Sequence, residues 1–234
     1  MKTTWLSIVD EIVHDILLQG GAPAPPVDAV RIAQRLGIIL AADVSQMGRA
    51  RQKRFGEQSV ILVRPDDRPE RLQWAVAHEL GEIFAHRVAE RATEQGILEE
   101  LPVREEIANR FASRLLLPSR WFDEDARRCR GDLPTLKEIY RTASHESIAW
   151  RLLDLDDSTV ITICDQGSVS ARRGNFSCPN RLHPIEKAAW EEAHNRNRPS
   201  CREEESVRIQ CWPIHELNWK REILRTTCKD FEAA

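Results

Sequence analysis

A histidine and two glutamates stand close together between Trp74 and His86, and their spacing suits metal-assisted hydrolysis. His78 and Glu82 are four residues apart, so on a helix their side chains lie one turn above the other, about 40° apart around the axis. Two such side chains can bind one ion. Glu79 has the position of the proton-accepting carboxylate in the HExxH motif of zinc hydrolases, but the motif here reads HExxE.

The same stretch also fits an ordinary amphipathic helix. Its apolar residues recur on the opposite face, at Leu72, Val76, Leu80, Ile83 and Phe84. In such a helix the polar face, which carries His78, Glu79 and Glu82, usually lies in solvent. Gly81 indicates a close approach by another backbone or by a substrate, because glycine inside a helix costs about 1 kcal/mol relative to alanine. His86 lies about 12 Å beyond His78 along the axis, too far for both to bind one ion.

A second helix with chemically useful residues is predicted between Glu105 and Pro118. Glu105, Ala108, Asn109 and Ala112 fall on one face of this helix. The small alanines would allow another helix to come close, which would bring Glu105 to the same ion. Considered alone, Glu105 is typical of an exposed acid.

Together the two stretches resemble the ImmA/IrrE family of gluzincin-like metallopeptidases, over roughly residues 25–120. The motifs are His78-Glu79-Leu80-Gly81-Glu82 and Glu105-x-x-Ala108-Asn109-x-Phe111-Ala112-x-x-Leu115-Leu116-x-Pro118. The resemblance implies that His78 and Glu105 bind the metal and that Glu79 is the general base, with Glu106 as an alternative to Glu105. Glu82 stands where the family has its second histidine, so its role as a ligand is carried over by position only. The resemblance also implies a protein substrate, such as a helix-turn-helix repressor.

The glutamate in the fifth position of the motif decides which ion would suit the site. A carboxylate binds zinc at about 2.0–2.2 Å, so His78, Glu82 and Glu105 can hold Zn²⁺ and leave a position open for water. Replacing a neutral imidazole by an anion favours Mn²⁺ or Fe²⁺ and weakens the activation of water. Two hypotheses remain open: a metal-dependent endopeptidase, and a catalytically silent family member without metal that regulates by binding a protein or DNA.

The pattern of the whole chain predicts an α+β protein, with a gluzincin-like half followed by a helical pair and a small α/β appendage. In the first half, we expect helices over residues 5–17 and 27–36, strands over 38–40 and 59–63 in a small antiparallel sheet, and then the two motif helices. The basic segment 49–55 is most simply a solvated strand face. The functional alternative is the lip of a groove that holds an extended peptide by edge pairing.

The domain boundary is expected near residue 155, with a metallopeptidase-like domain over 1–155 and a small α/β domain over 156–234. Residues 133–155 predict two short helices. They resemble the helix-turn-helix that the same family places after its catalytic unit, but a plain helical hairpin is favoured. Few basic side chains line the second helix, so direct binding to nucleic acid is not favoured.

The last third of the chain predicts a strand, a turn and a second strand over 158–172, then a helix from His183 toward His194. A polar connector over 195–205 and another strand over 207–212 follow. A second metal site could be considered at Cys211, His215 and Cys228. Their spacing matches no known zinc finger, so buried thiols are expected instead.

Composition narrows the class of protein further. The formal net charge is -3 and the sequence pI is near 6.2, so no overall basic excess indicates a nucleic-acid-binding protein. The six cysteines include no CxxC pair, and reduced thiols in a cytoplasmic protein are the simplest expectation. The chain contains no apolar run long enough to span a membrane, so no membrane association is expected.

Overall fold

The computed structural model describes residues 4–228 except 57, 67, 156 and 205. Contacts between Cα atoms divide the chain into two compact units, one up to Ser144 and one from His145 onward. In the described part of the chain, no helix combines the length and apolar character that crossing a membrane requires.

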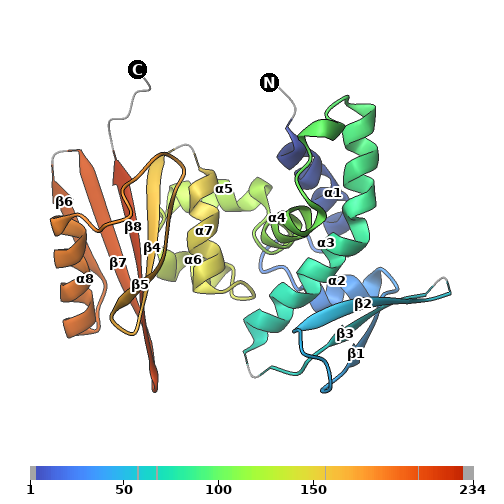
Figure 1. Cartoon of the computed structure of the whole chain (residues 1–234), viewed down its shortest axis with the longest axis horizontal. Coiled ribbons are helices and arrows are strands. Elements are labelled where there is room, and N and C mark those ends of the chain that lie inside the picture. The colour runs from blue at the N-terminus through green and yellow to red at the C-terminus, as the bar shows by residue number, and fades with distance from the viewer. Residues whose placement is uncertain (1–3, 57, 67, 156, 205, 229–234) are drawn as a thin grey trace. The chain divides into compact units, whose positions relative to one another are not determined.

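The first unit is mainly helical. Its helices are α1 (Trp5–Gln19), α2 (Ala29–Arg35), α3 (Pro69–Glu94), α4 (Arg104–Leu116), α5 (Ser119–Arg128) and α6 (Leu133–Ile139), with a short 3₁₀ turn at Leu98–Glu100. Helix α1 starts at a capping box formed by Thr4 and Ser7. Its apolar face is completely buried and packs against α3 and α4, which form the centre of this unit (Figure 1). The long helix α3 begins with Pro69 in its first turn, where proline is favoured because its missing N–H would have no partner in the helix.

A three-stranded sheet lies beside α2 and α3 (Figure 1). Its strands are β1 (Ile39–Ala42), β2 (Ala50–Phe55) and β3 (Gln58–Val63), in the order β1-β3-β2. The small antiparallel sheet predicted from the sequence is wrong for β1, which pairs with β3 in parallel, whereas β2 is antiparallel to β3. The apolar strand β3 takes the centre because Val60 and Ile61 are buried, which leaves the basic strand β2 at an edge. Residue 57, between β2 and β3 in the sequence, lies outside the described residues.

The second unit combines a short helix, a five-stranded antiparallel sheet and one long helix. Its elements are α7 (His145–Arg151), a 3₁₀ turn at Leu152–Asp154, β4 (Ser158–Asp165), β5 (Ser168–Gly174), α8 (Pro184–Arg196), β6 (Ser200–Glu204), β7 (Val207–Glu216) and β8 (Trp219–Cys228). The strand order is β5-β4-β8-β7-β6. Helix α8 covers one face of this sheet (Figure 1). Ile185 and Ala189 of α8 pack there against Cys164, Cys211 and Leu224.

The α+β class predicted from the sequence is confirmed, and most of the predicted elements form at the expected places. Helix α5 and strands β6 and β8 were not predicted. The connector expected over 195–205 is wrong over Ser200–Glu204, which forms β6, and residue 205 lies outside the described residues.

Candidate metal site

Helices α3 and α4 approach each other closely at Gly81. A Cβ atom added to Gly81 would lie 2.8 Å from both the Cα and the carbonyl oxygen of Ala108 on α4, and 3.0 Å from Cβ of Phe111. Real Cβ atoms do not come this close to a backbone, so only glycine fits at this position of α3. The close helix contact predicted from Gly81 and the alanines of α4 is therefore confirmed.

This contact brings three potential ligands together. The nearest ligand atoms of His78 and Glu82 on α3 and of Glu105 on α4 all lie within 4.8 Å of one another. The Nε2 atom of His78 is 3.7 Å from Oε2 of Glu105. The side chains of His78 and Glu82 are 19% and 23% exposed, whereas Glu105 is 70% exposed. The cluster is therefore open to solvent on the side of Glu105.

Asn109, one turn after Glu105 on α4, fixes the orientation of the histidine. Its Nδ2 donates a hydrogen bond to Oε1 of Glu105 at 3.2 Å, and its Oδ1 lies 3.1 Å from Nδ1 of His78. Because Oδ1 of an amide can only accept, Nδ1 of His78 carries the proton in this arrangement. The lone pair of Nε2 then points toward Glu105 and is free to bind an ion, as in many metal sites whose histidines are held by a second hydrogen bond.

Glu79 lies on the side of α3 that packs against strand β2. It is buried, and the backbone N–H of Gln52 on β2 donates a hydrogen bond to its carboxylate. Burial raises the pKa of the Glu79 carboxyl, and the negative charges of Glu82 and Glu105 raise it further. His78 and the hydrogen bond from Gln52 act in the opposite direction but do not cancel this increase. A carboxylate with a raised pKa in such a place is suited to accept and return a proton.

Arg104, the first residue of α4, holds the unusual glutamate of the motif. Its Nε atom is 2.6 Å from Oε2 of Glu82, and its Nη2 donates to the backbone carbonyl of Glu82 at 2.8 Å. Arg104 was not among the residues predicted from the sequence to belong to the site. The available signal was electrostatic, because a third carboxylate beside Glu79 and Glu105 needs a compensating cation.

Two further residues considered in the sequence do not join the cluster. His86 is exposed, and its Nδ1 lies 2.8 Å from the carbonyl oxygen of Ile83. Glu106 is also exposed, and among the described residues the group of close ligand atoms contains Glu105 and not Glu106.

The donor set fits a divalent cation. One imidazole nitrogen and two carboxylates from adjacent helices are ligands that zinc and other divalent metals accept, and three protein ligands leave coordination positions open. Arg104 pairs with Oε2 of Glu82, so Oε1 is the oxygen that would bind the ion. The side chain of Arg104 is 63% exposed, so it can move with little cost if both oxygens are needed.

Two adjacent helices with this arrangement of residues are typical of metallopeptidase-like proteins. Residues 33–152, about half of the chain, match the peptidase M78 family, which is described as the IrrE N-terminal-like domain. The chain therefore belongs to this family, and the resemblance noted in the sequence is confirmed.

The comparison of folds extends beyond the region that matches the family. A solved structure described as a Mycobacterium tuberculosis transcriptional regulator is similar to this chain with a TM-score of 0.66 and 17% sequence identity. The similarity covers 94% of this chain and 75% of that chain, and at this identity it concerns the fold alone. No curated protein matches the sequence.

Proposed function

We propose that this protein is a metal-dependent endopeptidase that cleaves a regulatory protein, such as a helix-turn-helix repressor. The observation that carries the proposal is the convergence of His78, Glu82 and Glu105 within 4.8 Å, next to the buried carboxylate of Glu79. Zn²⁺ is the first candidate ion, with Mn²⁺ and Fe²⁺ as alternatives because two of the three ligands are carboxylates.

Each residue of the site has a role in this proposal. His78, Glu82 and Glu105 would hold the ion, which when bound supplies Lewis-acid activation of water and of the peptide carbonyl. Glu79 accepts the proton of the attacking water at its carboxylate and returns it to the leaving amine. Asn109 keeps Nε2 of His78 directed at the site through its contact with Nδ1.

Strand β2 supports an extended peptide as the substrate. It is an edge strand of the three-stranded sheet, and its residue Gln52 contacts Glu79. An extended segment that pairs with the free edge of β2 would place its backbone beside the general base, as in other cases of strand addition. The basic side chains of β2 favour a segment with acidic residues.

Metal content and cleavage can be measured on the same purified full-length chain. The protein is prepared without oxygen in Zn²⁺, Mn²⁺ or Fe²⁺ and compared with Glu105→Ala and Glu79→Gln. We expect Glu105→Ala to lose one equivalent of metal and Glu79→Gln to keep it. With a library of proteome-derived peptides as the probe, Glu79→Gln should lower the rate of cleavage about 10²-fold or more, which mass spectrometry of the new termini measures.

The contact between Arg104 and Glu82 favours a second candidate, the catalytically silent regulator. An ion pair at 2.6 Å satisfies the carboxylate without a metal. If no equivalent of any of the three ions depends on Glu105 or His78, and if the Arg104→Ala variant does not bind metal either, the endopeptidase proposal is wrong. A pull-down with helix-turn-helix proteins would then be the test of the silent regulator.

A further inference from the structure

Three titratable side chains converge in the second unit, far along the sequence from the candidate peptidase site. His194 is in the last turn of α8, His215 is near the end of β7, and Glu222 is on the neighbouring strand β8. Pro213 is directly opposite Glu222 in the register of the two strands, so His215 is on the same face of the sheet as Glu222. Helix α8 packs on that face and brings His194 down onto it.

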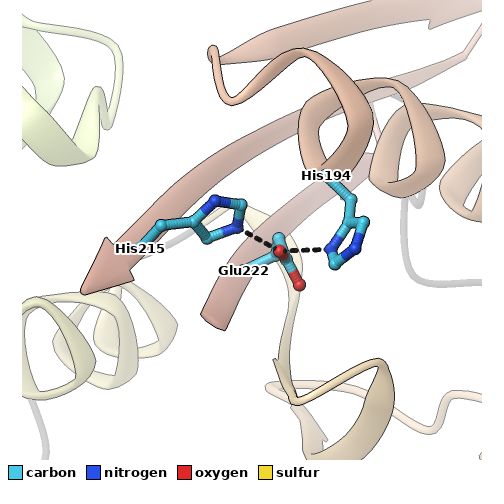
Figure 2. Close-up of side chains that lie close together, drawn as sticks. All are labelled: His194, His215 and Glu222. Carbon is cyan, nitrogen blue, oxygen red and sulfur yellow. Dashed lines mark hydrogen bonds and ion pairs between the residues drawn. The ribbon is translucent and has the colours of Figure 1, made fainter. Parts of the chain in front are cut away.

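Both imidazoles point at the same oxygen of the carboxylate (Figure 2). The Nδ1 atom of His194 is 2.8 Å from Oε1 of Glu222, and Nε2 of His215 is 2.5 Å from the same atom. The other oxygen, Oε2, accepts a hydrogen bond from the indole N–H of Trp190 at 2.9 Å. Carboxylates that bind metals commonly have such a hydrogen bond on the second oxygen, because it fixes their orientation.

The burial of Glu222 is the reason to look for a cation here. Its side chain is completely buried, on a strand between β4 and β7. Among the described residues, its ion-pair partners are the two histidines, and no lysine or arginine lies within 4.0 Å of its carboxylate. Buried charges in proteins are paired with an opposite charge or bind a metal, because leaving water is costly for an unpaired ion.

The cluster is also accessible from solvent. His194 is 31% exposed and His215 is 11% exposed. Strand β6 pairs with β7 only from Val207 to Cys211, so within the described residues no strand pairs with the other side of β7 at His215. An ion can therefore reach the two imidazoles, and water can fill its remaining coordination positions.

We propose that His194, His215 and Glu222 form a binding site for a divalent transition-metal ion such as Zn²⁺, separate from the site on α3 and α4. Two imidazoles and one carboxylate are ligands that zinc accepts, and all three ligand atoms lie within 4.8 Å of one another. Tetrahedral ligands with bonds of about 2.0–2.2 Å are about 3.4 Å apart, so the histidines must move back from Glu222 by less than about 1 Å. The exposed end of α8 allows this movement for His194.

Metal binding would change the tautomers of both histidines. In the hydrogen-bonded arrangement, Nδ1 of His194 and Nε2 of His215 carry protons that they donate to Glu222. These are the same atoms that must present lone pairs to the ion, so in each neutral ring the proton moves to the other nitrogen. This movement gives the site a spectroscopic signature that does not depend on activity.

The test uses the full-length chain with the first site disabled by His78→Ala and Glu105→Ala. Zn²⁺ alone is titrated by calorimetry, and Co²⁺ alone is followed by visible absorption. We expect one equivalent to bind and the melting temperature to rise, because the ion binds the folded state. His194→Gln and His215→Gln should each weaken binding at least tenfold, whereas His86→Gln, which removes an exposed histidine outside both clusters, should leave it unchanged.

A second measurement needs no substitution in the second unit, so it does not depend on whether the His194 and His215 variants fold. Long-range ¹⁵N spectra of the same background protein should show the His194 Nδ1 and His215 Nε2 signals shift on addition of Zn²⁺. If neither signal moves and no equivalent binds, the three side chains form only a hydrogen-bonded network and the proposal is overturned.

Discussion

Glu82 is the residue that most strongly affects the chemistry of the candidate peptidase site. It adds a negative charge next to Glu79 and Glu105, and Arg104 is the cation that offsets this charge. Helix geometry predicts that His78 and Glu82 lie together on α3. The place of Glu105 beside them was expected from the small alanines of α4 and from the family resemblance. The sequence could not predict Arg104, since the first residue of α4 reaches Glu82 only through the packing of two helices.

Because Glu79 is buried, we expect its ionised carboxylate to lower the free energy of unfolding by an amount that depends on pH. Its pKa is raised in the folded state, so the folded protein binds more protons than the unfolded one and loses stability as the pH rises above about 4.3, the ordinary glutamate value. Glu79→Gln removes this penalty and keeps an acceptor for Gln52. We expect the metal-free variant to be more stable at pH 7 by about 1 kcal/mol, measured by denaturant unfolding in chelator.

Glu90→Gln is the matched control for this prediction, because Glu90 is exposed on the same helix. It should change the free energy of unfolding by less than about 0.5 kcal/mol at any pH. If Glu79→Gln were instead less stable than the wild type, the carboxylate would stabilise the folded protein, and this prediction would be wrong.

At the scale of elements, the pairing of α3 with α4 builds the candidate site, and the sequence indicates it well. Gly81 and Ala108 are small where two backbones meet, and that signal can be recognised without a structure. Strand β8 was missed for the opposite reason. Buried Glu222 and Arg225 interrupt its apolar pattern, so the central strand of the larger sheet looks like a surface segment. The sequence therefore suggested His215 as a ligand only together with Cys211 and Cys228, and its grouping with His194 and Glu222 could not be predicted before the fold was known.

Gly81→Ala tests the contact between the two helices. Alanine favours the helix by about 1 kcal/mol, but its Cβ would meet the backbone of Ala108, which cannot rotate away, and overpacking costs about 1–3 kcal/mol. We expect a net loss of stability of up to about 2 kcal/mol and weaker metal binding, because Glu105 moves away from His78. Thermal unfolding and metal titration measure the two effects.

The control for Gly81→Ala is Glu90→Ala, at an exposed position of α3 where the gain in helix propensity meets no neighbour. It should leave both quantities nearly unchanged. A Gly81→Ala variant that is as stable as the wild type and binds metal equally well would contradict the close contact.

At the scale of the whole molecule, the chain consists of two units with separate cores, and each unit carries its own cluster of histidine and glutamate side chains. Unfolding should therefore not be a single two-state transition, and stability should be measured for each unit by itself. In the second unit, Arg221 connects Asp165 at the end of β4 with Glu146 on α7.

Asp165→Asn is expected to destabilise the second unit in a pH-dependent way. Burial raises the pKa of Asp165, but hydrogen bonds from Arg221 and Ser170 outweigh it and leave the pKa below its ordinary value. The stability that this carboxylate provides is complete above about pH 3.9 and is lost as the pH falls through the lower folded value. At pH 7, we expect a loss of about 1–3 kcal/mol, measured by hydrogen exchange of β4 and β8.

The matched control is Asp157→Asn, which breaks a pair between Arg225 and an aspartate whose side chain is 62% exposed. Its effect at pH 7 should stay below about 1 kcal/mol. If Asp165→Asn has the same small effect, or if its effect grows as the pH is lowered from 5 to 3, the role assigned to the pair with Arg221 is wrong.

Strand β6 is one of the two edge strands of the larger sheet, and its residues affect how this edge meets other molecules in a concentrated solution. It is a border strand of only five residues, and Arg202, Glu203 and Glu204 on it are exposed. A border strand with free N–H and C=O groups can recruit a strand from a second molecule and start an aggregate. Such pairing here would strip water from three charged side chains, so this border should oppose self-association even when the protein is crowded.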